Sequence, residues 1–486
     1  MSIKKRILLG TSAASLMASI GFGALAEDKP FDGETVKWLI PSGHNAYIMK
    51  VHQDEVKEKL GITLEGTEIN ENQIFETAMS DWVTGSVDYC LVTLLAPWNG
   101  DFMDGGFLRP LDDLIAGSET GGAAASDIIE QFGVLATQWN GTPYAFGQDG
   151  DITGLYFRKD ILGNEEIMAG FKEAKGYDLP NPPQTVPQLV DIAEYLNGMD
   201  WDGDGDVEYG YAQTWHVPWR TFLPFYGSAT GGDVLFDAEM NPKINRPEVA
   251  EMLNDMRRLV QAGPPGASSY GYVEGPASFI NGDVPATWFW GDVAKLIYTP
   301  GWAGDPQFVG EHWKGQIGYG LLPGYEVDGE TYNYSELGGK IVGITEACEN
   351  PEAAFAALSF LSDPSRSYKT VDSTATGSDP FGTSQLNRPA EEWDVVIDQE
   401  YLDLIPELMS NGYPAPPIPG GQEYLEAIDR HISGFLVDEN ASAEDTLAAI
   451  TDDWQQITDS RDRDAQIKVW GAYLNQLGSM GFKVSQ

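Results

Sequence analysis

The sequence predicts an α/β fold with two or more domains and largely parallel sheets. Short β-like runs alternate with amphipathic helical segments along the chain, an alternation typical of sheets that helices cover on both faces. The 486 residues are enough for several domains of about 100 to 200 residues each. Because the chain has no internal repeat and no Pro/Ser-rich linker, two lobes would have to be joined by strands that cross between them.

Strand patterns and a helix stop signal define the first elements. Short β-like runs at residues 35–40, 62–65 and 87–95 predict three strands. A helix is expected over residues 51–60, and it ends at Gly61, a residue type that readily closes helices. Strands and a helix thus follow one another at short intervals, which favours parallel pairing.

Three later helices carry capping signals. Thr185 and Gln188 form a capping box with a proline inside the first turn, and this helix is expected to stop at Gly198. Asn350, which a proline follows, opens a second helix, and Ser442 caps a third. The buried face of the third helix is expected to hold Leu447, Ile450 and Trp454.

The N-terminus is typical of a secretory signal. Basic residues at positions 4–6 precede an apolar stretch over 7–25, and Ala24-Leu25-Ala26 has the small-x-small form of a cleavage site. A membrane anchor is the alternative, but Gly, Ser and Thr interrupt the stretch and no basic cluster follows it. We expect residues 1–26 to be a cleaved signal peptide. Export by this signal would place the mature protein in the periplasm. Because no cysteine lies near the cleavage site, we expect the mature protein to have no lipid anchor.

The net charge limits the kinds of binding partner, and the cysteine content bears on disulfide formation. The formal net charge of -45 argues against nucleic acid and anionic membrane surfaces, and it favours neutral or cationic ligands over anionic ones. Cys90 and Cys348 are the only cysteines. The periplasm would permit a disulfide, but two distant cysteines form no framework, so two separately buried thiols are expected.

One acidic loop has the spacing of a calcium site. Acids occupy its first, third and fifth positions, glycine the sixth, and Glu208 the ninth. Position twelve is Tyr211 rather than the usual bidentate glutamate, so a closing ligand would come from elsewhere. The sequence predicts a structural Ca²⁺ here, with an unmetallated acidic turn as the alternative. The candidate ligands are Asp200, Asp202, Asp204, Asp206 and Glu208.

Several weak motifs occur in the order found in one known family. The chain resembles extracellular solute-binding protein family 1, the sugar-binding proteins of ABC importers that include maltose-binding protein. The motifs are GGFLRPLDD at 105–113, GTPYAFG at 141–147 with LYFRKD at 155–160, FINGDVPAT at 279–287, YGLLP at 319–323, GGKIVGI at 338–344 and NPEAA at 350–354. Each is unspecific alone, whereas their order along nearly the whole mature chain is specific.

The resemblance implies a two-lobed periplasmic-binding-protein fold of type II, with hinge-connected lobes and a ligand cleft. The chain would cross the hinge near 147–151, near 338–343 and after about Asn387. The implied units are residues 27–148 plus 339–388 for the N-terminal lobe, and residues 149–338 plus 389–486 for the C-terminal lobe. The implied function is a monomeric, non-catalytic component that captures a carbohydrate, either a sugar or an oligosaccharide, and delivers it to an ABC permease.

Sugar sites combine aromatic platforms with hydrogen-bonding side chains, and both kinds of residue occur at loops that match the family's cleft. Polar candidates follow the first strand or lie at the first crossing, and Arg220 could also donate to a ligand. Trp288 and Trp290 alternate, so a strand would point both to one face. For each tryptophan the alternative is an ordinary core residue. The candidates are Ser42, His44, Asn45, Asp149, Asp151, Trp98, Trp215, Trp219, Trp288 and Trp290.

The sequence departs from the family where Trp288, Phe289 and Trp290 stand in place of a smaller residue. A ligand placed differently from maltose is therefore expected. Two other functions stay open: a binding protein for a polyamine, peptide or other cationic nutrient, and a secreted carbohydrate-active enzyme. No H-E-x-x-H, C-x-x-C, G-x-S-x-G or P-loop motif supports an enzyme, and with 74 carboxylates any acid pair is uninformative.

Overall fold

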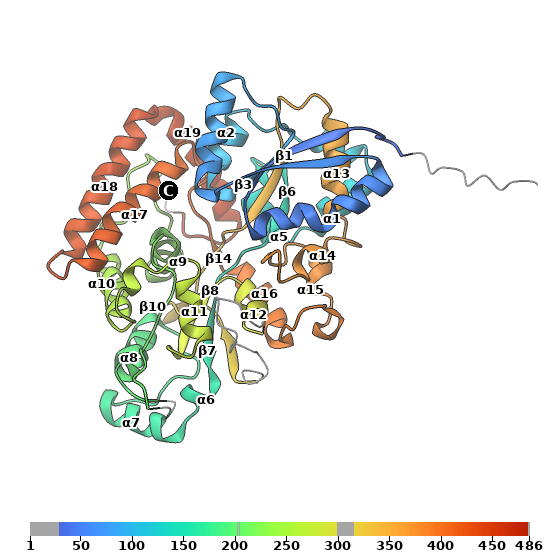
Figure 1. Cartoon of the computed structure of the whole chain (residues 1–486). Coiled ribbons are helices and arrows are strands. Elements are labelled where there is room, and N and C mark those ends of the chain that lie inside the picture. Colours follow the sequence, from blue (N-terminus) through green and yellow to red (C-terminus); the bar gives the residue numbers. More distant parts are fainter. Residues whose placement is uncertain (1–28, 202, 204, 299–314, 485–486) are drawn as a thin grey trace, which may run out of the picture.

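The N-terminal lobe is built on a five-stranded mixed sheet. The computed structural model describes residues 29–201, 203, 205–298 and 315–484 (Figure 1). In the sheet order β2-β1-β3-β13-β6, β1 pairs in parallel with β2 and β3, whereas β13 is antiparallel to β3 and β6. The strands are β1 (Thr35–Pro41), β2 (Thr63–Ile69), β3 (Leu91–Leu95), β6 (Ala145–Asp149) and β13 (Lys340–Ile344).

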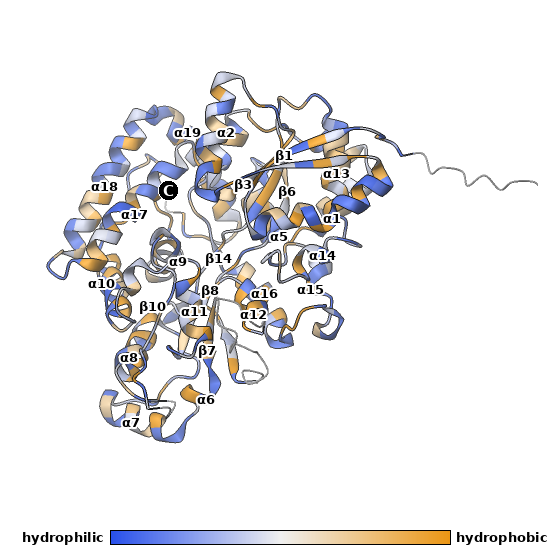
Figure 2. Ribbon diagram, viewed as in Figure 1, coloured by the Kyte–Doolittle hydropathy of each residue, from blue (hydrophilic) through white to orange (hydrophobic). Residues whose placement is uncertain are grey.

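Helices cover both faces of this sheet, because its strands bury both sets of alternating side chains. Val36, Trp38 and Ile40 of β1 join the apolar cluster under α1 (His44–Leu60) and α13 (Pro351–Leu361). Leu39 points to the opposite face, toward α2 (Glu71–Thr84). Figure 2 shows apolar residues along these strands and polar ones along the outer side of α1. The shorter helices of this lobe are α3 (Asp112–Ala116), α4 (Glu119–Asp127), α5 (Glu130–Phe132), α14 (Tyr368–Val371) and α15 (Thr383–Leu386).

The C-terminal lobe contains a smaller sheet in which every pairing is antiparallel. Its order is β8-β7-β9, with β7 (Gly154–Arg158) between β8 (Ala286–Phe289) and β9 (Ile317–Gly320). The prediction of largely parallel sheets is therefore wrong for this lobe. Strand β7 enters the sheet from the other lobe, whereas β8 enters from helices within the same lobe. Strands β7 and β8 are therefore not joined by the single right-handed helical crossover that makes neighbouring strands parallel.

Helices make up most of the C-terminal lobe. Those before β9 are α6 (Lys159–Leu162), α7 (Glu165–Lys175), α8 (Val186–Leu196), α9 (Trp219–Ala229), α10 (Pro247–Gln261), α11 (Glu274–Ile280) and α12 (Asp292–Leu296). Those after it are α16 (Gln399–Ser410), α17 (Gly421–Val437), α18 (Ala443–Ser460) and α19 (Arg463–Ser479). None of the described helices combines the length and the apolar composition that a bilayer span requires.

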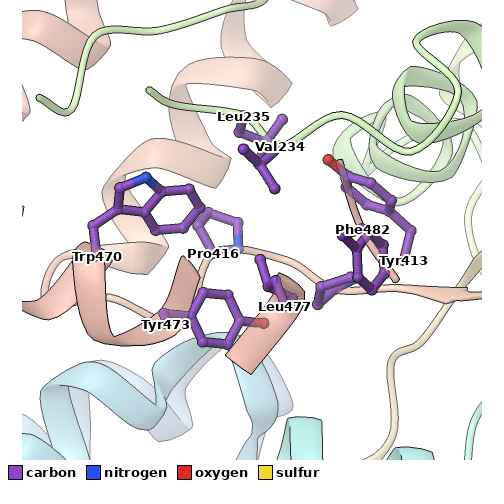
Figure 3. Close-up of a pocket in the computed structure, with 9 residues that line it drawn as sticks. Val234, Leu235, Tyr413, Pro416, Trp470, Tyr473, Leu477 and Phe482 are labelled. Carbon is purple, nitrogen blue, oxygen red and sulfur yellow. The ribbon is translucent and has the colours of Figure 1, made fainter. Parts of the chain in front are cut away.

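The last helix packs into an aromatic core. Trp470, Tyr473 and Leu477 of α19 face Tyr413 and Phe482 in Figure 3. The space left between these side chains is about 10 Å³, too little for a sugar. This part of the lobe is packed interior rather than a ligand site.

Local signals placed most helix ends correctly. The capping box of Thr185 and Gln188 is present, although α8 ends at Leu196, two residues before the predicted stop at Gly198. The caps of α13 at Asn350 and of α18 at Ser442 are also confirmed. The helix before Gly61 ends as predicted but begins at His44 rather than at residue 51. Burial of its first turns against the sheet outweighs their weak helix propensity.

The sequence-predicted strand at 87–95 is too long. Strand β3 begins at Leu91, because its neighbours β1 and β13 reach it only from that residue onward.

Two crossings between the sheets run side by side. The chain leaves β6 at Asp149 and enters β7 at Gly154, and it returns from Glu336 to β13 at Lys340. The backbone N–H of Gly338 donates to the carbonyl of Asp151 at 3.1 Å, so the crossings brace each other. A third connection lies between α15 and α16. The lobe boundaries, as units that move relative to each other, stay a prediction.

The two cysteines form a disulfide, so the prediction of two separate thiols is wrong. Cys90 lies directly before β3, and Cys348 follows β13 after a short turn. These strands are antiparallel neighbours with Leu91 opposite Ile344, so the ends from which the cysteines project lie together. The Cα atoms are 4.5 Å apart although 258 residues separate the two cysteines in sequence. This proximity depends on β13 returning to the first sheet, which spacing alone does not reveal.

Candidate functional site

A cavity of about 240 Å³ lies between the two lobes. It is far larger than four other cavities in the described part of the chain, which are at most about 10 Å³ each. Its N-terminal-lobe lining consists of His44, Glu71, Asp149, Asp151, Lys340, Thr374 and Gly377. Its C-terminal-lobe lining consists of Arg220, Tyr272, Val273, Phe289, Trp290, Asp292 and Leu296.

Strand ends place the polar residues of the N-terminal wall. His44 begins α1 shortly after β1, and Glu71 begins α2 shortly after β2. Because β1 and β2 are parallel, their carboxyl ends lie at one edge of the sheet, where α/β folds commonly bind ligands. Burial lowers the pKa of His44 below its ordinary value, and the nearby Lys340 lowers it further. The imidazole is therefore neutral at pH 7.

Lys340 ties the two crossings together at the floor of the cavity. Its ammonium nitrogen lies 3.3 Å from a carboxylate oxygen of Asp149, 3.3 Å from one of Asp151 and 3.8 Å from one of Glu71. Burial alone would lower the pKa of Lys340, but Asp151, Glu71 and Asp149 outweigh it and raise that pKa well above its usual value. Lys340 is therefore a permanent cation.

Buried carboxylates surround this lysine. Burial and the charge of Asp151 raise the pKa of Asp149 to about 7, and one of its oxygens accepts from the backbone N–H of Asp379 at 2.8 Å. Burial and Asp151 also raise the pKa values of Asp292 and Asp379 well above normal. Carboxylate oxygens of Asp149, Asp151 and Asp379 lie within 4.8 Å of one another. This group is acidic, and Lys340 pairs with two of its members, Asp149 and Asp151.

Glu336 positions the aromatic wall. It is 1% exposed, and its two carboxylate oxygens accept from Arg220 Nη1 at 2.7 Å and from Trp290 Nε1 at 2.8 Å. The guanidinium of Arg220 lies over two indole rings, 4.5 Å from the centroid of Trp219 and 5.0 Å from that of Trp290. Burial raises the pKa of Glu336 above its usual value. The ring of Trp290 is therefore fixed before a ligand arrives.

The backbone around Trp290 is fixed as well. Its carbonyl accepts from the Tyr156 hydroxyl at 2.9 Å, and the next N–H, of Gly291, donates to Asp379 at 2.6 Å. A Cβ atom at Gly291 would lie 1.8 Å from the Tyr401 hydroxyl oxygen, so the close approach requires glycine. Trp290 thus has little freedom to move in this arrangement.

The structure brings four of the predicted ligand residues together in the cavity: His44, Asp149, Asp151 and Trp290. Arg220, which the sequence suggested as a donor, lies in the same wall. Their contact with a ligand stays a prediction.

The other predicted ligand residues lie outside the cavity lining. Trp98 is buried and donates from Nε1 to Gln422 at 2.8 Å, a contact with α17. Trp288 does not line the cavity, although its ring centroid lies 5.8 Å from that of Trp290. Strand β8 ends at Phe289, so the predicted alternation does not extend to Trp290, and Phe289 rather than Trp288 lines the cavity beside it. Trp219 lies behind Arg220, and Trp215 is fully buried. Ser42 and Asn45 flank His44 without lining the cavity. Their roles as direct contacts also stay predictions.

Sequence reasoning missed Glu71, Tyr272, Phe289, Asp292 and Lys340. Glu71 could have been found, because it follows a parallel strand just as His44 does. Lys340 lies within the predicted second crossing, but only the pairing of the two crossings reveals its contacts. Tyr272 comes from a loop between η4 (Ala267–Ser269) and α11, for which no sequence pattern gives a position.

The predicted calcium loop is described only in part, since Asp202 and Asp204 lie outside the described residues. Asp200 accepts from the backbone N–H of Gly203 at 2.8 Å, and Glu208 accepts from that of Trp201 at 2.9 Å. These contacts form a turn stabilised by its own acids. Calcium binding stays a prediction that a metal titration must test.

Solved structures of similar fold cover almost the entire chain. An ABC transporter solute-binding protein from Agrobacterium radiobacter K84 in complex with ribitol has a TM-score of 0.70 and 21% identity, over 88% of this chain and 100% of that one. Maltose-bound MalE3 of T. maritima has a TM-score of 0.68 and 19% identity, over 87% and 99%. An Agrobacterium vitis S4 solute-binding protein with D-mannitol has a TM-score of 0.66 and 18% identity, over 88% and 99%.

These structures confirm the two-lobed α/β fold that the motifs implied. The model of the bacterial extracellular solute-binding protein family matches residues 54–365, more than half of the chain, and the chain therefore belongs to this family, as the order of its motifs predicted.

Proposed function

We propose that this protein is the solute-binding component of an ABC importer and that it captures a sugar or polyol and delivers it to a membrane permease. The observation that carries the proposal is the cavity between the lobes, whose lining comes from both sheets and combines an aromatic wall with charged hydrogen-bonding groups. Such a lining suits a molecule with apolar C–H faces and a rim of hydroxyls. The ribitol, D-mannitol and maltose in the similar structures agree with this class.

The size of the cavity limits the solute. A volume of about 240 Å³ is somewhat larger than a cavity of about 150 Å³ that holds one benzene molecule. This is room for one sugar unit or a short polyol rather than for an oligosaccharide. The bulky sequence Trp288, Phe289 and Trp290 fills space along the C-terminal wall.

Delivery follows from hinge bending. A cavity lined by both lobes is complete only when they are closed, so a bound solute stabilises the closed form, which the permease then recognises. Family membership implies a location outside the cytoplasmic membrane, in the periplasm or extracellular. We propose the periplasm, with residues 1–26 removed as a signal peptide. We also propose that the mature protein is monomeric and unlipidated, and that it releases its solute unchanged.

The test is a binding screen on the purified mature protein. Tryptophan fluorescence and thermal shift would be recorded with pentitols, hexitols, monosaccharides, disaccharides and longer oligosaccharides, and each mixture would be analysed for products. We expect saturable binding of a single sugar unit or polyol without turnover. Chemical conversion of a bound solute would show that the protein is an enzyme, and failure of every carbohydrate to bind would refute the proposal.

A matched pair of variants assigns the fluorescence signal to the cavity. Trp290→Phe should remove most of the ligand-induced change, because Trp290 lines the cavity. Trp82→Phe should keep it, because Trp82 packs against Phe107 near the far end of α2, away from the cavity lining.

A further inference from the structure

The cavity walls carry more carboxylates than cations. Four acids, Glu71, Asp149, Asp151 and Asp292, face two permanent cations, Arg220 and Lys340. His44, the one histidine in the described part of the lining, is kept neutral by burial and by the nearby Lys340. With every acid ionised, the described lining has a formal charge of −2, the difference between these counts. Burial and the neighbouring Asp151 raise the pKa values of Asp149 and Asp292, so a bound cation would favour the ionised forms of these acids.

Both cations already have carboxylate partners. Arg220 is paired at 2.7 Å with Glu336, a buried acid outside the lining. Lys340 lies 3.3 Å from both Asp149 and Asp151. Lys295, on α12 behind the wall, donates to the backbone carbonyls of Ser378 at 2.5 Å and Val371 at 3.3 Å. The strong donors of the site are therefore engaged before a solute enters.

Two buried carboxylate oxygens, one in the lining and one outside it, have no hydrogen-bond partner among the described residues. One is Oδ1 of Asp292, which lines the cavity, and the other is Oδ1 of Asp379, a residue only 1% exposed. Leaving a buried carboxylate oxygen without a donor is costly, more so than for a neutral polar atom. A solute that brings a donor to the Asp292 oxygen, which lines the cavity, relieves part of this cost.

We propose that the solute carries a protonated amino group in addition to its hydroxyls, and that this ammonium group lies against Asp292 and Asp151. This inference rests on the proposed function, because it specifies the class of carbohydrate that the same cavity accepts: an amino sugar or an amino alditol. An ammonium group has three donors and no acceptor, whereas a hydroxyl also needs a donor for its own oxygen. The walls are rich in acceptors, so they match an ammonium group better than a hydroxyl group.

The aromatic wall favours the same charge. Phe289 and Trp290 line the cavity beside Asp292, and the negative face of an aromatic ring attracts a cation within about 6 Å of its centroid. The remaining hydroxyls of the solute can reach Lys340, Arg220 and His44. Charge and donor count therefore distinguish an amine-bearing carbohydrate from a neutral one of equal size.

The experiment compares ligands that differ only in one hydroxyl and one amine. Isothermal titration calorimetry at pH 7 would use D-glucitol with 1-amino-1-deoxy-D-glucitol, D-glucose with D-glucosamine, and the galactose and mannose pairs. We expect the amine member of at least one pair to bind tenfold or more tightly than its hydroxyl partner, which corresponds to about 1.4 kcal/mol. Asp292→Asn should reduce this ratio to near one, and Asp54→Asn, an exposed acid on α1, should leave it unchanged.

The outcomes separate the two proposals. If the neutral members bind as tightly as the amines or more tightly, the amine inference is wrong and the carbohydrate-binding function stands. If a simple diamine such as putrescine binds as well as the amino sugars do, the hydroxyl requirement and the carbohydrate function are both wrong. If no amine and no carbohydrate binds, both proposals fail. If the Asp292→Asn variant does not fold, Asp151→Asn replaces it, and it should likewise reduce the affinity ratio of amine to hydroxyl ligand.

Discussion

Replacing Cys90 and Cys348 by serine removes the covalent link between the ends of two neighbouring strands in the N-terminal lobe. The link closes a loop of 258 residues that contains β6, β13 and all the chain between them. The chain-entropy relation gives about 5 kcal/mol of stabilisation for a loop of this length. If the C-terminal lobe stays folded while the N-terminal lobe unfolds, the effective loop is shorter, but the effect falls only to about 4 kcal/mol because it depends on the logarithm of the loop length.

Urea unfolding followed by circular dichroism measures this difference between the wild-type protein and the double variant. We expect the free energy of unfolding to fall by about 4 to 5 kcal/mol, and reduction of the wild-type protein should have a similar effect. A double alanine variant controls for the serine hydroxyls. An unchanged unfolding midpoint, or two thiols that react in the denatured protein without a reductant, would show that the reasoning is wrong.

Four further predictions concern the site and its surroundings. Trp290→Ala should weaken solute binding about 3- to 10-fold, since an aromatic contact contributes about 0.5 to 1.5 kcal/mol beyond its area; unchanged affinity by calorimetry would reject this platform. Glu336→Ala should lower stability by about 3 to 5 kcal/mol, because it leaves the buried guanidinium of Arg220 unpaired; a melting temperature close to that of wild type would contradict this. Burial raises the pKa of Asp429 to about 7 from an ordinary value of 3.8, so the folded state holds this proton more tightly than the unfolded state. Stability should therefore fall as pH rises from about 4 to about 7, and Asp429→Asn should flatten this dependence in thermal melts. If the loop from Asp200 to Glu208 binds calcium, EDTA should lower the melting temperature and added Ca²⁺ restore it; indifference to both would refute the calcium prediction.

Sequence reasoning succeeded where a structure depends on residues close together in the chain. The caps at Thr185, Asn350 and Ser442 need only neighbouring atoms, and all three are present. The position of His44 after β1 follows from a general rule for parallel strands. Local chemistry and one topological rule were sufficient for these features.

Features that depend on distant segments could not be predicted in the same way. The antiparallel sheet of the C-terminal lobe, the disulfide and the contacts of Lys340 all require knowing which strand returns beside which. Tryptophans illustrate the same limit: Trp98 and Trp290 both follow strand ends, yet one contacts α17 and the other lines the cavity. The tryptophan content of the sequence drew attention to both residues, but only the pairing of distant elements shows that their surroundings differ.

The ammonium group of Lys340 lies at the point where two chain crossings meet, and its partners Asp149 and Asp151 belong to the opposite crossing. If the solute binds against Asp151 as proposed, it also changes the ion pairs that join the two crossings, and recognition and lobe closure would then use the same atoms. Substitutions there would alter affinity and closure together, and neither effect could be selected alone. Efforts to change which solute is accepted without disturbing motion should begin instead at Tyr272 and Val273, the more exposed residues of the cavity wall, which lie far from both crossings in the chain.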